Sequence, residues 1–586
     1  MMMWRGFVLA SSLVAMACDG SLSGQLSATS ESTGDSSTPN DEPGSQQPGE
    51  RRQLSAADLF PCSDSLPSGP GKSLMLSRGQ LQNTLEDLFG SAVLGSASVA
   101  LSRLPDEVFD DVSHIRLSTV SSAKIDAFYQ IARSVSDGVI SDDDATRDVF
   151  GGCALSGSQP AACVSGFVDG FAARILRRPL EERERAFIQT LIDQPDSELR
   201  AQLGAALTYL LASPHFLWRI ERGVEAAEDG TTTLSQYEIA TRISYIFADT
   251  TPDTALESRA REGRLNSIDA VRDEARRMLR TPRGRRKLTQ AIARWSLTDR
   301  TEDLSNLPAG LTEGVDIPAL EASMVEEAQY YIETMVFERN TTFEELLTSS
   351  LSFAEDPELA SLYGHTPAGP DSPSEFSGRR RGLLLRAPAL TATGARAHII
   401  NRGVDTQLRF LCNKIPEPNV DIADDRTNNE PSEEEQLAMS NRAIVEQATS
   451  NELCASCHDV INPTGAVFES FDSLGRLREQ EQIFDSEGES HGFVDIDSAA
   501  EIPLASGETI SAADAYDFVG YIAESNEGKA CFTRNVFRYM GEKAEENADE
   551  CGFLDEGDAL LASTTSIVEL VVASIANPDF LIKRND

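Results

Sequence analysis

The stretch LSQYEIATRISYIFADTTPDTAL, residues 234–256, predicts an amphipathic helix with a well-marked start. Ser235, followed three residues later by Glu238, forms a capping-box pattern in which each side chain satisfies a backbone N–H of the first turn. Ile239, Ile243 and Ile246 recur at helical spacing and share one face. The stretch therefore indicates a helix that buries one side against a core.

The same spacing dominates the chain from residue 76 onward. In LSRGQLQNTLEDLFG (76–90), Leu81, Leu85 and Leu88 fall on one face, and Ser77 is a candidate N-cap. Strand signals are few, and the best is SHGFVDIDS at 490–498. The chain is therefore predicted to be mainly α, a multi-domain helical protein with a few short strands near the C-terminus. Further predicted helices cover 177–194, 198–222, 269–298, 319–337 and 343–348.

The charge balance excludes one class of partner. The 586 residues include 94 acidic and 51 basic side chains, which gives a formal net charge of -43. Nucleic-acid binding needs a basic face against the phosphates, so this composition argues against it. The acidic residues are spread along the chain, as on a solvated surface, and the length suggests several domains.

The N-terminus predicts export. MMMWRGFVLASSLVAMAC has one basic residue, Arg5, then an apolar stretch and small residues before Cys18. The AMAC ending resembles the lipobox of bacterial lipoproteins, in which the cysteine becomes the acylated N-terminus; an ordinary signal peptide cut nearby is the alternative. Residues 19–60 are rich in Ser, Thr, Gly, Pro and Gln and predict a flexible linker. We therefore expect a lipid-anchored protein of the bacterial cell envelope, periplasmic or surface-exposed.

Eight cysteines remain after Cys18, and an even number in an oxidising compartment favours pairing. Cys153 with Cys163, and Cys531 with Cys551, are close in sequence and are the expected disulfides. Cys62 and Cys412 would then pair with each other or stay reduced. Six cysteines outside the motif described next allow about 15 pairings, so the sequence does not fix the connectivity.

The segment CASCH, residues 454–458, carries the strongest chemical signal. In a covalent haem site, one helical turn presents Cys454 and Cys457 for thioether bonds, and His458 becomes the proximal iron ligand. A thioredoxin-like pair would need a βαβ setting, and structural zinc would need two further ligands at similar spacing. A chance motif with a disulfide is the fourth interpretation. Covalent haem c is the expected cofactor.

The sequence does not decide which residues would surround the expected haem iron. The proximal imidazole needs an acceptor for its other nitrogen, and Asp459 is one candidate. An open or water-ligated iron is an alternative to a distal protein ligand. The histidines and methionines weighed as distal ligands are His114, His215, His365, His398, His491, Met439 and Met540.

Several stretches together resemble a family of exported bacterial proteins that is abundant in planctomycetes and myxobacteria. Its members are assembled from domains of unknown function that are often labelled cytochrome-c-associated. The matching stretches include LSRGQLQNTLEDLFG, RRPLEERE, LLASPHFLWRIE, LSQYEIATRISYIFADTTPD, RRGLLLRAPALT, NRGVDTQLRFLCNKIPEPNV, CASCHDVINPTGAVFESFDSLGRLR and CFTRNVFRYMGE, in the family's order.

The resemblance implies a helical, exported, multi-domain protein with one haem-type motif, and it supplies no reaction. By analogy with small c-type cytochromes, it suggests the backbone carbonyl of Pro463 as the acceptor for the proximal imidazole. Two positions depart from the family pattern. Ala448 stands where relatives carry histidine, and Glu542 follows Gly541 where relatives carry arginine.

The expected function is that of an exported c-type haem lipoprotein, for electron transfer or an oxidative reaction at the envelope. The alternative is a non-catalytic envelope protein that binds a polysaccharide or a protein partner, with a structural CxxCH. Neither enzyme class, substrate nor redox partner is indicated, and no catalytic residue is identified. The expected divisions are a signal peptide with lipobox (1–18), a linker (19–60), helical domains at 61–150, 151–225 and 230–365, a CxxCH haem-type domain at 375–480 and a C-terminal helical domain at 490–586.

Overall fold

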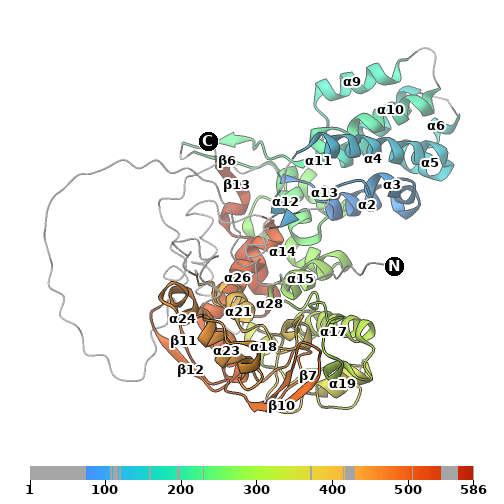
Figure 1. Cartoon of the computed structure of the whole chain (residues 1–586). Coiled ribbons are helices and arrows are strands. Elements are labelled where there is room, and N and C mark those ends of the chain that lie inside the picture. The colour runs from blue at the N-terminus through green and yellow to red at the C-terminus, as the bar shows by residue number, and fades with distance from the viewer. Residues whose placement is uncertain are drawn as a thin grey trace, which may run out of the picture. The chain divides into compact units, whose positions relative to one another are not determined.

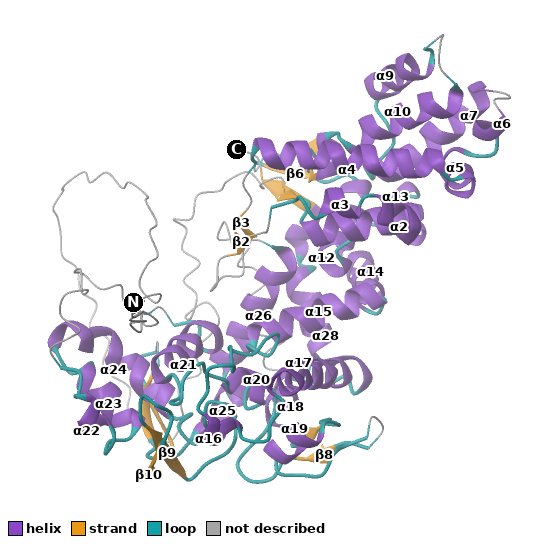
Figure 2. Ribbon diagram, turned by 45° about the vertical axis from the view of Figure 1, so that its right-hand side comes forward, coloured by secondary structure: helices purple, strands orange, loops and turns teal. Residues whose placement is uncertain are grey.

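Helices make up most of the protein, as the sequence predicts (Figure 2). The structure is a computed structural model. It describes residues 74–105, 108–109, 116–117, 120–156, 160–194, 198–228, 230–369, 372–413, 415, 429–504, 506–542 and 565–584. The predicted signal peptide, Cys18, the linker, Cys62, His114 and Cys551 lie outside this part. Within it, no helix has the length and apolar character needed to cross a membrane.

The first group of elements covers residues 74–233. It comprises β1 (Leu74–Met75), α2 (Arg78–Ser96), α3 (Ser98–Leu101), β2 (Val108–Phe109), β3 (Arg116–Leu117), α4 (Ser122–Ser141), α5 (Asp143–Phe150), α6 (Cys153–Ser156), α7 (Pro160–Gly166), η1 (Phe167–Phe171), α8 (Ala172–Leu176), α9 (Glu182–Ile192), α10 (Leu199–Leu211), α11 (Pro214–Leu217), β4 (Trp218–Arg219), β5 (Glu225–Ala226) and β6 (Thr231–Thr233).

One apolar core joins this group. Leu81 and Leu85 of α2 are buried with Val135 of α4 and with Leu203 and Leu207 of α10. The segments expected as separate domains on either side of residue 150 therefore share a core. Helix α2 starts as predicted, because the Ser77 hydroxyl accepts a hydrogen bond from the Gln80 N–H and the Gln80 side-chain oxygen accepts one from the Ser77 N–H.

The central group contains the stretch quoted first. It comprises α12 (Gln236–Ala248), α13 (Thr254–Arg261), α14 (Ile268–Leu279), α15 (Pro282–Trp295), α16 (Ala309–Thr312), α17 (Ile317–Glu333), η2 (Thr334–Glu338), α18 (Phe343–Thr348), β7 (Leu351–Ser352), α19 (Pro357–Leu362), β8 (Ser374–Glu375) and α20 (Ala387–Leu390).

The predicted capping box is present in α12. The Ser235 hydroxyl accepts from the Glu238 N–H at 3.2 Å, and the Glu238 carboxylate accepts from the Ser235 N–H at 2.7 Å. Ile239 and Ile243 are buried in the core. The single helix expected over 269–298 is instead two helices, α14 and α15, because Pro282 begins a new helix after the Thr281 cap.

The last group carries the CxxCH segment. It comprises α21 (Ile399–Asp405), η3 (Thr406–Phe410), α22 (Glu433–Gln436), α23 (Asn441–Ala448), α24 (Glu452–Ala466), β9 (Gln480–Phe484), β10 (Ser490–Asp495), β11 (Ala500–Pro503), β12 (Thr509–Ala512), α25 (Ala515–Glu524), α26 (Asn526–Gly541), α28 (Ile567–Ile575), η6 (Pro578–Leu581) and β13 (Ile582–Arg584).

A second, larger core runs through the central and last groups. Trp295 at the end of α15 is almost fully buried and makes edge contacts with Phe410 and Phe532. Helix α26 packs against α15, and α28 packs against α26 and α14 (Figure 1). Residues expected in three separate domains therefore share this core. The C-terminal strand β13 also pairs antiparallel with β6 of the first group.

The strand expected at 490–498 is present as β10 and pairs antiparallel with β9. The neighbouring strands β11 and β12 form a second two-stranded ribbon. The β11–β12 ribbon lies beside α24 (Figure 1), and β9 contacts the start of α23 through Glu481 and Asn441. This region is the one in which the sequence predicted short strands.

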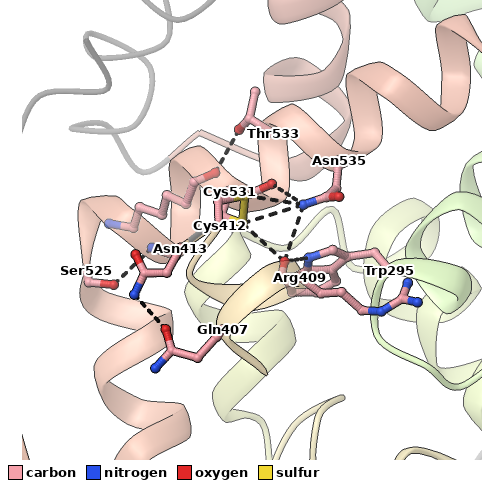
Figure 3. Close-up of a disulfide and its surroundings, with 11 residues drawn as sticks. Trp295, Gln407, Arg409, Cys412, Asn413, Ser525, Cys531, Thr533 and Asn535 are labelled. Atoms are coloured by element: carbon pink, nitrogen blue, oxygen red, sulfur yellow. Dashed lines mark hydrogen bonds between the residues drawn. A yellow bond between two sulfur atoms is a disulfide. The ribbon is translucent and has the colours of Figure 1, made fainter. Parts of the chain in front are cut away.

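The disulfide connectivity corrects the prediction. Cys531 is bonded to Cys412, with Cα atoms 5.4 Å apart, and not to Cys551 (Figure 3). Cys412 is therefore also unavailable to Cys62. Proximity in sequence failed as a guide because η3 and α26 pack together in the core and bring the two cysteines into bonding range. Cys153 is also in a disulfide, but its partner is outside the described side chains, so its pairing with Cys163 stays a prediction.

Candidate functional site

The CASCH segment forms the first two turns of α24. The Asn451 side chain caps this helix by accepting a hydrogen bond from the Cys454 N–H at 2.8 Å. Cys454, Cys457 and His458 stand at positions i, i+3 and i+4, so their side chains lie along one face of the helix. All three are partly exposed, and neither Cys454 nor Cys457 is in a disulfide. The helix thus presents two thiols and an imidazole together.

Asn462 holds the imidazole of His458. The His458 Nδ1 lies 2.9 Å from the Asn462 Oδ1, one helical turn further along α24. The sequence suggested Asp459 for this role and the family resemblance suggested the carbonyl of Pro463, but the acceptor in the structure is Asn462. Asp459 is exposed, and Pro463 lies inside the helix. The sequence analysis missed Asn462, although the spacing His-x-x-x-Asn on a helix could have indicated it, since residues four apart are neighbours.

Helix α24 is seated against α21 by two glycines. A Cβ added at Gly403 would lie 2.1 Å from the Ile461 carbonyl oxygen, and one added at Gly465 would lie 1.9 Å from the Ile399 carbonyl oxygen. Any side chain larger than hydrogen would therefore push the two helices apart. The Gln407 amide also donates to the Thr464 hydroxyl at 2.7 Å. These contacts fix α24 along the half that follows the motif.

A buried arginine supports the turn that follows α24. Arg402 of α21 donates to the carbonyl oxygens of Phe468, Phe471 and Asp472, and also to that of Leu390. Burial lowers the pKa of Arg402 to about 10, which leaves the guanidinium charged at neutral pH. The side chain therefore satisfies several carbonyls of the turn from within the core.

Buried carboxylates anchor the start of α23, the helix before the motif. The Glu481 carboxylate accepts from the Asn441 N–H at 2.8 Å and from Arg396 at 3.0 Å. The Asn441 side chain also donates to Glu469 at 3.1 Å. Burial raises the pKa of Glu469, and the charge of Arg478 opposes that shift. Sequence patterning gave no indication of this cluster, because its members come from four separate segments.

The expected distal ligands are mostly engaged elsewhere. His215 belongs to the first group of elements and lies 3.1 Å from an Arg222 nitrogen. His491 pairs with Asp485 at 2.8 Å on the β9–β10 ribbon. The His365 Nδ1 lies 2.7 Å from its neighbour's carbonyl oxygen, that of Thr366. Met540 is fully buried in the large core.

Two candidates lie in the same region as the motif. His398 is the N-cap residue of α21, without a side-chain capping hydrogen bond, and it precedes Ile399, whose carbonyl oxygen faces Gly465. Gly465 is seven residues beyond His458, so the two histidines are offset by about 10 Å along α24. Met439 follows α22, and its carbonyl oxygen accepts from Arg396 at 3.1 Å. The structure therefore does not bring His398 opposite His458, and it identifies no distal ligand among the described residues.

The fold and site define a class, a mainly helical multi-domain chain with one helix that presents two thiols and an imidazole. Family models identify three of its domains, each described as a protein of unknown function. They are PSD5 (DUF1595) over residues 163–221, PSD4 (DUF1592) over 234–365 and PSCyt3 (DUF1588) over 380–481. The CxxCH helix lies inside the third. No curated protein and no solved structure matches the chain.

Proposed function

We propose that the domain of residues 380–481 is a c-type cytochrome domain in which Cys454 and Cys457 hold a haem covalently and His458 is its proximal ligand. The observation that carries this proposal is the common face of α24, on which both thiols stand beside an imidazole held through its Nδ1. That arrangement leaves the His458 Nε2 for the iron. The PSCyt3 label of the family model supports a cytochrome-like domain.

The donor set fits a covalently attached haem. Cys454 and Cys457 would each hold the haem through a thioether bond, which would form by addition of the S–H bond across a vinyl group, with sulfur on one vinyl carbon and hydrogen on the other. Both cysteines keep their thiols for this addition, which distinguishes the site from a Cys454–Cys457 disulfide. A bound haem would supply a one-electron iron couple. The chain's own contribution is to hold His458 and to keep α24 seated through Gly403 and Gly465.

The test is a pyridine haemochrome assay on the full chain produced together with haem-attachment machinery. We expect one covalent haem per chain in the wild type and its loss or marked reduction in Cys457→Ala. Ser456→Ala, in the same helical turn, is the matched control and should keep the haem. A wild-type chain without haem, or with stoichiometric zinc by elemental analysis, would overturn the proposal.

We further propose that the chain is exported and lipid-anchored through Cys18. The Cys412–Cys531 disulfide supports an oxidising compartment, where such bonds persist. Metabolic labelling with a palmitate analogue should mark the wild type and fail for Cys18→Ser. Equal labelling of the two chains would contradict the anchor.

A further inference from the structure

The hydrogen bond from His458 is the first of a series that ends on backbone. The His458 Nδ1 lies 2.9 Å from the Asn462 Oδ1, and the Asn462 Nδ2 lies 2.8 Å from the Thr449 Oγ1. The Thr449 hydroxyl in turn lies 2.7 Å from the Val445 carbonyl oxygen in α23. Asn462 is buried, with 8% of its surface exposed. The side chains of His458 and Asn462 in α24 are thus linked through Thr449, the C-cap residue of α23, to the backbone of α23.

The backbone end of this line decides where each proton lies. The Val445 carbonyl oxygen can only accept, so the Thr449 hydroxyl must use its single hydrogen there. Thr449 can then only accept from its other neighbour, which places the Asn462 NH₂ toward Thr449 and its oxygen toward His458. A reversed amide would leave two oxygens facing each other without a hydrogen between them. The Asn462 oxygen therefore requires a hydrogen on the His458 Nδ1.

We propose that Asn462 and Thr449 are positioning residues that fix neutral His458 as the tautomer protonated at Nδ1, with the Nε2 lone pair free before any metal binds. Neutral imidazole carries one proton, so a proton held at Nδ1 leaves Nε2 as the ligand atom. The inference rests on the proposed function only in assigning that atom to haem iron. The tautomer itself is a property of the protein without haem.

Thr449 also connects the two helices that flank the motif. It is the C-cap residue of α23, two residues before Asn451, the N-cap of α24. The line from Val445 to His458 therefore ties the imidazole to the preceding helix as well as to its own. An amide acceptor carries no charge, unlike a carboxylate in the same place, and leaves the imidazole a weaker electron donor to the metal.

The first measurement is the nitrogen NMR spectrum of the ¹⁵N-histidine-labelled full chain without haem, at about pH 8.5, where imidazole is neutral. The His458 signals are assigned by their loss in His458→Gln. We expect a protonated Nδ1 and a bare Nε2 in the wild type and in Thr449→Ser, which keeps the hydroxyl. Asn462→Leu and Thr449→Val should raise the fraction protonated at Nε2. A wild type protonated mainly at Nε2, or unchanged signals in a folded Asn462→Leu chain, would overturn the proposal.

The second measurement uses the haem-loaded chain and the conservative variant Asn462→Asp. This variant keeps an acceptor, so the Nδ1 proton should remain, but the added charge should lower the reduction potential relative to the wild type. An unchanged potential would contradict the positioning role at the metal. If the wild type shows the expected tautomer but takes up no haem, the proposed function fails while the tautomer assignment stands.

Discussion

Cys412 and Cys531 lie 119 residues apart in sequence and form a disulfide that joins the end of η3 to α26. Asn535 donates to the Cys531 carbonyl oxygen at 2.9 Å, and both Asn535 and Trp295 donate to the Arg409 carbonyl oxygen beside the bond (Figure 3). The bond therefore lies within a packed and hydrogen-bonded junction. It links the domain that carries the CxxCH helix to the C-terminal helices of the large core.

Removal of this disulfide should lower the stability of the folded chain. Closure of a loop of this length in the unfolded state is worth about 5 kcal/mol, so we expect a clear fall in the urea midpoint for the Cys412→Ala/Cys531→Ala chain. The matched control is Cys454→Ala/Cys457→Ala in haem-free protein, which removes two thiols that are not in a disulfide and should cost little. Non-reducing peptide mapping should link Cys412 to Cys531, and a Cys531–Cys551 peptide would contradict the structure.

The close approach of α21 and α24 predicts an effect of single methyl groups. Gly465→Ala or Gly403→Ala places a carbon about 2 Å from a backbone oxygen of the other helix, and such overpacking costs about 1–3 kcal/mol or more. Gly95→Ala in α2 is the control, because nothing lies within 4 Å of its added carbon. In thermal unfolding, we expect a midpoint lower than that of the wild type for Gly403→Ala and Gly465→Ala, and an unchanged midpoint for Gly95→Ala. Equal midpoints would show that the helices can move apart freely.

Glu542, which departs from the pattern of the family that the sequence resembles, has a specific partner in this chain. Its carboxylate lies 3.0 Å from Arg219 of β4, and both side chains are largely buried. Glu542→Arg should therefore bring two buried positive charges together and destabilise the fold by about 3 kcal/mol. The exchange Arg219→Glu/Glu542→Arg should recover part of that loss. Asp144→Arg, in an exposed pair, is the control and should change the unfolding midpoint little.

The sequence predicted features that depend on near neighbours. The capping boxes, the helical class and the common face of Cys454, Cys457 and His458 all follow from spacing within a few turns. The partner of Cys412 could not be predicted, because it depends on which helices pack together across 119 residues. Helical spacing would have been enough to predict the contact between His458 and Asn462, which are four residues apart. The hydrogen bond from Asn462 to Thr449 joins two segments, so spacing within one helix could not predict it. Long-range packing thus accounts for most of what the sequence left open.

The buried carboxyl of Glu469 predicts a pH-dependent contribution to stability. Burial raises its pKa in the folded chain above the unfolded value of about 4.3, so the folded state binds the proton more tightly. The contribution is fully present below the unfolded pKa and is lost as the pH rises towards the folded pKa. Glu469→Gln removes this group, and its hydrogen bond from Asn441 can be kept by the amide oxygen.

The measurement is the urea unfolding free energy of the wild type and Glu469→Gln at a series of pH values from about 4 to 8. The other carboxyl groups contribute equally to the unfolding free energies of both chains and cancel in the difference. If the amide of the Glu469→Gln variant fits poorly beside Arg478, the resulting loss of stability is the same at every pH. We expect the wild type to lose stability relative to the variant as the pH rises, by at most about 1.4 kcal/mol per pH unit within the window. A difference that stays constant with pH, or that changes in favour of the wild type, would show that the Arg478 and Arg402 charges and the Asn441 hydrogen bond offset or outweigh the burial of Glu469 and the nearby Glu481 charge.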